Sequence, residues 1–277
     1  MASQIPGKVA IVGCGYVGTA VARLWQQQGL MVTVTTTSPG RVDALQTVAD
    51  RVKVLKGTDP DALQDCLLDR QAVLLCVGSK RGAHYKETYL GTAKTLAEVL
   101  PNTAVQQLIY TSTYSVYGQH HGAVVTEATP VRPATANGEI IAETERTLLG
   151  LAGVTVCVLR LGGIYGPDRT LAKIYGRAAG QTRPGRGGEW ANWIHRSDII
   201  EAIEFARSHL LSGIYNLVQD EIPTVKELID RVCDRNAFAP VRWDPSQPSA
   251  RPYNAKVSNA KIKAAGYRFV HPRFFES

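Results

Sequence analysis

The stretch "KVAIVGCGYVGTAVARLWQQQG", residues 8–29, decides the fold that we predict for this chain. Its first part, 8–13, is a short apolar run that ends in glycine, which predicts a buried strand. Its second part, 16–29, carries apolar residues at helical spacing and ends in a glycine, which predicts a helix. The order of strand, glycine-rich turn and helix predicts the start of a βαβ unit.

The turn inside this stretch has the pattern G-x-G-x-x-G, formed by Gly13, Gly15 and Gly18. Its glycines allow a tight turn, close approach of the backbone to a pyrophosphate, and close packing of the helix on the strand. The helix N-terminus also offers backbone N–H groups to an anion. We therefore predict a dinucleotide site that includes Tyr16 and Val17, and a tight turn without a ligand is the alternative.

Strands and helices continue to alternate through the first half of the chain. Four more runs rich in β-branched or apolar residues predict strands, at 31–38, 52–55, 72–78 and 104–113. Two further segments predict helices, at 60–69 and 85–100. This alternation predicts an α/β fold, a doubly wound parallel sheet with helices on both faces, whose ligands bind at the carboxyl ends of the strands.

The end of the second predicted strand indicates which dinucleotide binds. NAD enzymes place an acidic residue about 20 residues beyond the glycines, where this chain has Thr36, Thr37 and Ser38, with Arg41 shortly after. Hydroxyl groups and a guanidinium suit a 2′-phosphate. We therefore expect NADP (NADPH) in preference to NAD, which stays possible if Arg41 is only a solvated helix residue.

Further site residues are expected on loops. Val77 and Gly78 end the fourth predicted strand and are assigned to the cofactor site, and Lys80 in the basic loop that follows is assigned to the substrate. Arg183 and Arg186 lie in a Gly- and Arg-rich stretch and are candidate phosphate anchors. A solvated basic loop is the alternative for the segment of Lys80, and a mobile surface loop is the alternative for the stretch of Arg183 and Arg186.

Composition narrows the class of protein. The 277 residues are 44% hydrophobic, enough for one large domain or a domain with a small appendage. We expect a cytoplasmic protein that does not bind membranes, because no stretch indicates a secretory signal or a membrane span, and the five scattered cysteines indicate reduced thiols. No metal-ligand spacing is visible. The net charge of +7 is spread along the chain, which favours a small anionic ligand over nucleic acid.

Later motifs carry a resemblance to a known family. They are "LIYTSTYSVYG" (108–118), "LRLGGIYGP" (159–167), "NWIHRSDIIEAI" (192–203) and "GIYNLVQDEIPTVKELI" (213–229). Their order and spacing resemble those of the extended short-chain dehydrogenase/reductases, the NAD(P)-dependent epimerases and dehydratases that mostly act on nucleotide-linked sugars. The resemblance implies a Rossmann-type NAD(P)-binding domain over 1–165 and a smaller C-terminal substrate region over 166–277, of which about 190–217 returns to the sheet.

The resemblance also implies catalytic positions, two of which have changed. Thr113 matches the family's Ser or Thr that bonds the reacting oxygen, but Thr135 and Glu139 stand where the Tyr-x-x-x-Lys pair belongs. A shifted register does not restore the pair, because the chain has no lysine between Lys94 and Lys173. A threonine hydroxyl is too weak an acid to replace the phenol. The chain thus resembles the atypical members that lack this pair.

Other side chains could still carry chemistry. Tyr117 could lend a hydroxyl to the substrate, although the family's tyrosine at this position usually packs. Glu139 could act as a base if desolvation raised its pKa, and a solvated helix carboxylate is the alternative. We interpret His195 and Asp198 as structural, with Asp198 capping the helix that follows.

Two functions follow from this pattern. The first is an NADP(H)-binding epimerase/dehydratase-like oxidoreductase that acts on an anionic substrate, such as a nucleotide-linked sugar or carbonyl compound, without the usual relay. The second is a non-catalytic NADP(H)-binding redox sensor or assembly protein with a protein partner. We favour the enzyme, because the cofactor carries the hydride chemistry and the protein mainly orients it.

Overall fold

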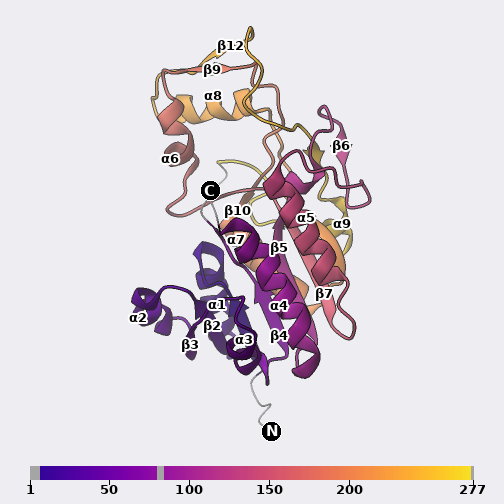
Figure 1. Cartoon of the computed structure of the whole chain (residues 1–277). Coiled ribbons are helices and arrows are strands. Elements are labelled where there is room, and N and C mark those ends of the chain that lie inside the picture. The colour runs from indigo at the N-terminus through magenta and orange to yellow at the C-terminus, as the bar shows by residue number, and fades with distance from the viewer. Residues whose placement is uncertain (1–6, 80–83, 276–277) are drawn as a thin grey trace. The chain divides into compact units, whose positions relative to one another are not determined.

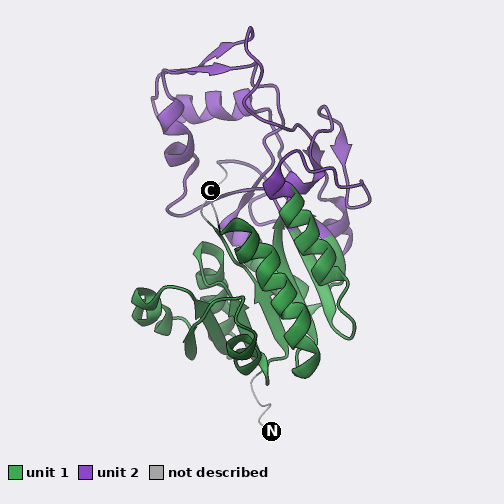
Figure 2. Cartoon of the chain, in the orientation of Figure 1, with its two compact units in different colours: residues 1–112, 139–159, 200–214 green, residues 113–138, 160–199, 215–277 purple. Residues whose placement is uncertain are grey.

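The computed structural model describes residues 7–79 and 84–275. The chain forms two compact units whose segments interleave along the sequence, shown in green and purple in Figure 2. Unit 1 comprises 1–112, 139–159 and 200–214, and unit 2 comprises 113–138, 160–199 and 215–277.

The central sheet confirms the predicted α/β fold. It has seven strands in the order β11-β7-β5-β4-β1-β2-β3, and the pairs β1–β2, β1–β4, β2–β3 and β4–β5 are parallel. The bounds are β1 Lys8–Val12, β2 Met31–Thr36, β3 Arg51–Val54, β4 Ala72–Leu75, β5 Gln107–Thr113, β7 Thr155–Leu161 and β11 Gly213–Leu217. All five strands predicted in the first half of the chain are therefore present.

Helices flank this sheet (Figure 1). They are α1 Tyr16–Gln27, α2 Val42–Gln46, α3 Pro60–Leu67, α4 Thr92–Val99, α5 Ala136–Leu149 and α7 Arg196–Ser208. The start of α3 shows how the local sequence sets a boundary. Asp59 accepts a hydrogen bond from the N–H of Ala62 at 3.1 Å, and Pro60 occupies the first turn.

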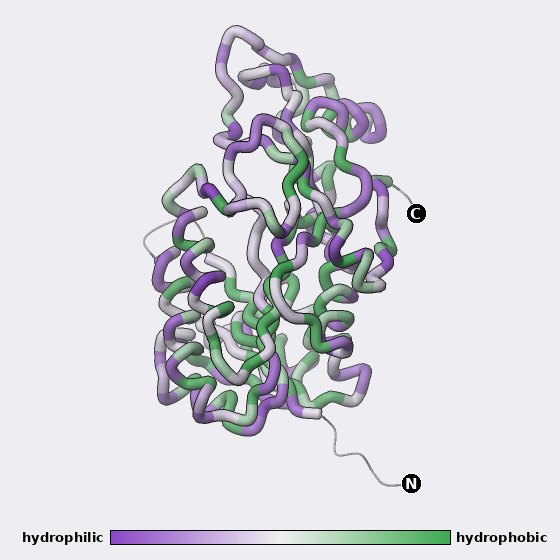
Figure 3. The backbone as a smooth tube through the Cα atoms, turned by 90° about the vertical axis from the view of Figure 1, so that its right-hand side faces the viewer, coloured by the Kyte–Doolittle hydropathy of each residue, from purple (hydrophilic) through white to green (hydrophobic). Residues whose placement is uncertain are grey.

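The core of unit 1 is apolar and almost completely closed to solvent. Val12, Leu75, Leu96 and Leu108 are at most 1% exposed and belong to one cluster that joins β1, β4, β5 and α4. Burying each such side chain contributes about 1.5–3 kcal/mol. Along the helices of unit 1 the tube in Figure 3 alternates between green and purple, as expected for helices with one buried face.

The five cysteines are all free, as expected for reduced thiols. Burial raises the pKa of the Cys66 and Cys76 thiols to about 11. The thiolate is the reactive form of cysteine, so both side chains stay in the less reactive thiol form at neutral pH, Cys66 in the core and Cys76 half-buried.

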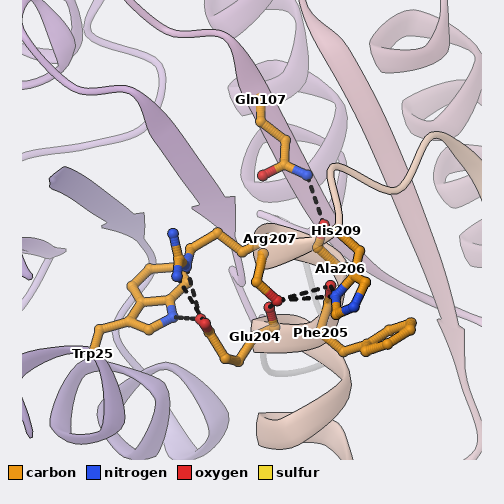
Figure 4. Close-up of polar contacts among 8 residues, drawn as sticks. Trp25, Gln107, Glu204, Phe205, Ala206, Arg207 and His209 are labelled. Carbon is orange, nitrogen blue, oxygen red and sulfur yellow. Dashed lines mark hydrogen bonds and ion pairs between the residues drawn. The ribbon is translucent and has the colours of Figure 1, made fainter. Parts of the chain in front are cut away.

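A polar cluster fixes α7 in unit 1 (Figure 4). The carboxylate of Glu204 accepts from the indole N–H of Trp25 at 2.9 Å and from both Nε and Nη2 of Arg207 at 2.7 Å. Nearby, Nε2 of Gln107 donates to the carbonyl oxygen of Ala206 at 2.8 Å. The bond from Trp25 attaches α7 to α1, and the bond from Gln107 attaches it to β5, whereas the pair of Glu204 and Arg207 lies within α7. A hydrogen bond to a charged group such as the Glu204 carboxylate contributes about 1.5–3 kcal/mol, and a neutral one such as that from Gln107 contributes about 0.5–1.5 kcal/mol.

Unit 2 is built from short elements. Three two-stranded sheets pair β10 with β8, β12 with β9 and β13 with β6, all parallel. The strands are β6 Val124–Val125, β8 Gly163–Tyr165, β9 Thr182–Pro184, β10 Trp193–His195, β12 Arg242–Asp244 and β13 Lys256–Val257. The helices are α6 Leu171–Tyr175, α8 Val225–Arg235 and α9 Ala260–Ala264.

The helix α8 has 11 residues, whereas α6 and α9 have five each. Thr224 and Glu227 form a reciprocal capping box at its start, in which Glu227 accepts from the N–H of Thr224 at 2.7 Å. Its buried face, which includes Leu228 and Val232, packs in a cluster with Tyr165 and Trp193. This cluster gives unit 2 an apolar core of its own.

The net charge of the chain belongs to unit 2. Unit 1 contains 13 Lys and Arg and 13 Asp and Glu, whereas unit 2 contains 18 Lys and Arg against 11 Asp and Glu. The whole excess of +7 is therefore carried by unit 2.

Within the described ranges, no helix is both long enough and apolar enough to cross a membrane.

Candidate cofactor and substrate sites

The glycine loop of unit 1 joins the end of β1 to the start of α1. Gly13 has φ +90°, and a Cβ atom on it would lie 2.7 Å from Cα of Val77. A Cβ on Gly18 would lie 3.0 Å from the carbonyl oxygen of Gly13. Both positions are thus restricted to glycine by the protein itself, one through backbone conformation and both through close packing.

Gly15 differs from its two neighbours. A Cβ at Gly15 would meet no protein atom within 4 Å. Gly15 is also the N-cap of α1, where no side chain caps the helix and no acidic residue lies in the first turn. The space and the helix N-terminus are therefore open to an anion, as the predicted pyrophosphate site requires.

The end of β2 holds the glycine loop in place. The N–H of Gly13 donates to Oγ1 of Thr35 at 3.0 Å, and the N–H of Cys14 donates to the carbonyl oxygen of Thr35 at 3.0 Å. Thr35 is buried, so its hydroxyl serves the loop. Sequence reasoning did not distinguish this threonine from the hydroxyl residues that follow it.

The residues predicted to select NADP come directly after Thr35 in the sequence. Thr36 is buried and its Oγ1 accepts from the N–H of Ser38 at 3.2 Å, while Thr37 and Ser38 are exposed. Arg41 lies in the short helical turn after β2, and its Nη1 donates to the carbonyl oxygen of Cys14 at 2.6 Å. The structure thus places the guanidinium of Arg41 on the glycine loop.

The other predicted cofactor residues lie at the end of β4. The backbone of Val77 packs against Gly13, and a Cβ on Gly78 would meet no atom within 4 Å. The predicted substrate residue Lys80 lies outside the described residues. Roles for Val77 and Gly78 in binding remain predictions.

Thr113 is the last residue of β5. Its Oγ1 accepts from the N–H of Ser115 at 3.3 Å and lies 3.2 Å from Oγ of Ser115, to which it donates. The side chain is partly exposed, so it is accessible at the carboxyl end of a central strand. This is the place where ligands of open parallel sheets bind.

Tyr117 has the environment of a packing residue. Its side chain is 0% exposed, and its hydroxyl donates to Oδ1 of Asn216 at 2.8 Å. The guanidinium of Arg160 lies 4.7 Å from the ring centroid. Burial raises the pKa of Tyr117, more than the nearby Arg160 lowers it. These contacts favour the packing role over the catalytic one.

Thr135 and Glu139, the two positions at which the resemblance implies the family's catalytic pair, are both exposed. Oγ1 of Thr135 accepts from the N–H of Gly138 at 3.1 Å, directly before α5, so this threonine caps the helix. Glu139 lies in the first turn of α5, where a carboxylate interacts favourably with the helix dipole. Its exposure matches the solvated carboxylate that we gave as the alternative.

A buried carboxylate near the end of β5 was not predicted. Oγ of Ser112 donates to Oε1 of Glu145 at 2.5 Å, and Glu145 is 3% exposed. Burial, and to a smaller extent Glu145, raises the pKa of Tyr110 well above its usual value. No sequence pattern separates Glu145 from the solvated glutamates of α5, because only the packing of α5 buries it.

In unit 2, one of the two predicted phosphate anchors acts electrostatically on the buried Tyr175. Burial raises the pKa of Tyr175, and the charges of Arg251 and Arg183 partly oppose this shift. Arg251 donates from Nη1 to the carbonyl oxygen of Trp190 at 2.8 Å. Arg183 and Arg251 thus act on the same tyrosine, and Arg251 was not predicted from the sequence, while Arg186 is exposed.

The predicted helix cap at Asp198 is wrong. Asp198 lies inside the first turn of α7, is 0% exposed, and accepts from the N–H groups of Val270 and His271 at 2.7 and 3.0 Å. Its carboxylate anchors the C-terminal segment, and only the tertiary structure brings these residues together. Asp198 therefore has a structural role, as we interpreted it, but it binds the C-terminal segment and not the start of the helix.

Known proteins resemble this chain along most of its length. A sequence model described as the NAD dependent epimerase/dehydratase family matches residues 9–217. Protein YeeZ of Escherichia coli (strain K12) is 32% identical over 239 residues, which cover 84% of this chain and 81% of that protein.

Solved structures share the fold. A functionally unknown conserved protein from Silicibacter pomeroyi DSS has a TM-score of 0.77 at 23% identity, covering 96% of this chain and 95% of that one. The UDP-glucose 4-epimerase of Thermus thermophilus, solved with NAD, has a TM-score of 0.75 at 21% identity, covering 94% and 93%. With its glycine loop, its parallel sheet and these matches, the chain belongs to the NAD-dependent epimerase/dehydratase family.

Proposed function

We propose that the protein is an oxidoreductase or epimerase-like enzyme that binds NADP(H) in unit 1 and acts on an anionic substrate, such as a nucleotide-linked sugar, held by unit 2. The observation that carries the proposal is the contrast between Gly13 and Gly15. Protein atoms exclude a side chain at Gly13, but none lies within 4 Å of a Cβ at Gly15. A glycine at an open position is expected where a ligand approaches the backbone.

The preference for NADP(H) rests on Arg41. The guanidinium hydrogen-bonds the carbonyl oxygen of Cys14, which lies inside the glycine loop. From there its remaining N–H groups can bind a phosphate beside the exposed hydroxyls of Thr37 and Ser38. No carboxylate follows β2 before Asp43, so a 2′-phosphate meets no repulsion from this segment.

The anionic substrate is supported by the charge of unit 2. That unit holds the whole net charge of +7, and Arg183 and Arg251 act on the same buried tyrosine, Tyr175. Two guanidinium groups suit a phosphate or diphosphate. Arg183 also lies 5.7 Å from the ring of Trp243, which holds the guanidinium in place.

The residues of this chain orient the substrate more than they move protons. A bound nicotinamide supplies the hydride chemistry. The hydroxyl of Thr113 donates to Oγ of Ser115. From this position it can accept from a substrate alcohol, or donate to a carbonyl oxygen when its proton turns away from Ser115. Thr135 is committed to capping α5, so no phenolate–ammonium pair assists at this helix. We expect slow turnover that depends on orientation.

A non-catalytic redox sensor is the second candidate. The exposed Thr135 and Glu139 favour it, because they replace both groups of the proton relay. A sensor binds NADPH and shows no turnover that depends on a substrate. An enzyme oxidises NADPH with a carbonyl substrate, and Thr113→Ala lowers the rate while Thr113→Ser retains most of it.

The first experiment is a calorimetric titration of the full chain with NADPH, NADP, NADH and NAD. We expect the phosphorylated pair to bind more tightly, and Arg41→Ala to weaken NADPH roughly tenfold or more with little effect on NADH. Arg23→Ala is the matched control, because Arg23 is exposed on α1. Equal affinities for NADPH and NADH in the wild type would refute the NADP preference, and no binding at all would refute both candidate functions.

A further inference from the structure

Unit 2 contains a cavity of about 420 Å³, lined by the loop after β8, α6, the end of β10, the end of α8 and the C-terminal segment. All of its lining residues belong to unit 2. None of the residues proposed above to bind the cofactor or the substrate is among them. Its volume falls within the range of about 300–1,000 Å³ that is typical of small-molecule sites.

The charged residues that line the cavity are all basic. Of these, Arg235 and Arg273 are exposed, and His195 and His271 are half-buried. Among the described lining residues there is no Asp or Glu. A cavity with two guanidinium groups and no lining carboxylate favours an anion.

The two histidine rings stack on each other, with centroids 3.8 Å apart. Nδ1 of His195 accepts from the N–H of Ser197 at 3.3 Å, so a neutral His195 ring carries its proton on Nε2. Burial, with a smaller contribution from His271, lowers the pKa of His195 to about 4, so this ring is neutral near pH 7. Its Nε2–H is therefore a fixed hydrogen-bond donor.

A buried carboxylate holds this wall of the cavity. Oδ2 of Asp198 lies 3.3 Å from Nδ1 of His271 and accepts the backbone N–H of the same residue at 3.0 Å. Oδ1 accepts from the hydroxyl of Tyr267 at 3.1 Å and from the N–H of Val270 at 2.7 Å. Because both oxygens are occupied, Asp198 is better suited to positioning His271 than to binding a metal ion.

The remaining lining is mainly aromatic and apolar, with Thr170 and Asn236 as its two polar side chains. The ring of Tyr165 meets that of His195 edge-on, with centroids 5.1 Å apart. The guanidinium of Arg235 lies 4.6 Å from the ring centroid of Phe275, and Leu171 is 5% exposed. An organic body, preferably a flat ring, can therefore pack here while its charged group stays near the rim.

We propose that this cavity is a second binding site, which takes a small phosphate ester with an aromatic or apolar body. Arg235 and Arg273 hold the phosphate at the rim, and the Nε2–H of His195 provides a further donor. The body of the ligand packs against Tyr165, Phe275 and Leu171. The site is separate from the cofactor site of unit 1 and from the cluster of Arg183 and Arg251.

Calorimetry with phenyl phosphate tests the proposal, since this probe joins a phosphate to an aromatic ring and has no nucleotide portion. The full chain is titrated with phenyl phosphate, inorganic phosphate and phenol, each with and without NADPH. We expect phenyl phosphate to bind more tightly than either part, and NADPH to leave its affinity unchanged. Arg235→Gln and Arg273→Gln should each weaken binding about fivefold or more.

Two variants control for position. Arg268→Gln removes an exposed arginine of unit 2 that does not line the cavity, and it should leave the affinity unchanged. Arg183→Gln removes an arginine of the proposed substrate cluster. If Arg183→Gln abolishes binding while the two cavity variants bind normally, the second site is refuted and the anion belongs to the substrate cluster. No binding of phenyl phosphate by the wild type would also refute it, whatever the result for NADPH.

Discussion

Unit 1 and unit 2 are suited to anions by different means. Unit 1 has no net charge, and its candidate site consists mainly of backbone, with glycines at the N-terminus of α1. Unit 2 carries the entire excess of +7, and its candidate sites consist of arginine and histidine side chains. In a backbone site, a substitution disturbs the close packing of the fold. In a site of exposed charged side chains, a substitution weakens binding but leaves the packing intact, and the binding responds to salt.

The largest effect is expected where the packing of unit 1 is closest. Gly13→Ala places a side chain on a residue with φ +90°, and its Cβ would lie 2.7 Å from Cα of Val77. We therefore expect the free energy of unfolding to fall by about 3 kcal/mol or more. Gly29→Ala is the control, because Gly29 has φ +80° but no atom within 4 Å of its Cβ position. It should cost only about 1 kcal/mol. Urea unfolding measures both, and equal losses would contradict the role of packing.

The second largest effect is expected at Gly15 of the same glycine loop, where a substitution should weaken cofactor binding but leave the stability of the fold almost unchanged. Gly15→Ala places a methyl group in open space, so we expect the free energy of unfolding to change by less than about 1 kcal/mol. The Kd for NADPH should rise about tenfold or more, because the methyl group occupies the approach of the pyrophosphate. Calorimetry alongside urea unfolding tests both parts. An unchanged Kd would show that the open space is not the cofactor site.

In unit 2, Tyr117→Phe tests whether a buried hydroxyl supports the fold or the reaction. The change leaves Oδ1 of Asn216 without its donor, so we expect a loss of about 1–2 kcal/mol in unfolding free energy. NADPH affinity and any turnover should stay within about twofold, which is about 0.4 kcal/mol. A tenfold loss of rate at unchanged stability would instead assign Tyr117 to catalysis.

The smallest effect is a dependence on pH. Folding lowers the pKa of His195 from 6.5 to about 4, chiefly by burial, so the unfolded chain binds more protons between these values. Above pH 6.5 His195 is neutral in both the folded and the unfolded chain and does not change the free energy of unfolding. As the pH falls from 6.5 toward 4, protonation of the unfolded chain increasingly destabilises the fold. His195→Asn, which keeps an acceptor near the N–H of Ser197, should lose roughly 1–2 °C less in Tm than the wild type between pH 7.5 and 5. Equal losses in both proteins would show that His195 does not contribute.

Much of unit 1 could be predicted, because its signals are local. The alternation of β-branched runs with helical spacing predicted each of the first five strands, and the glycines were placed between β1 and α1. The environments of Tyr117, Glu145 and Asp198 could not be predicted. Each depends on partners distant in the sequence, such as Asn216 for Tyr117 and Ser112 for Glu145.

The sequence by itself determined the family and the order of strands and helices, and it predicts the loss of the Tyr/Lys pair, because these follow from residue types at short spacing. Only the tertiary structure decided which glycine is open, which arginines line the same cavity and which carboxylates are buried. It also showed that the net charge is confined to unit 2, whose segments alternate with those of unit 1 along the chain. These properties depend on contacts between segments far apart in the chain, and spacing along the sequence contains no measure of them.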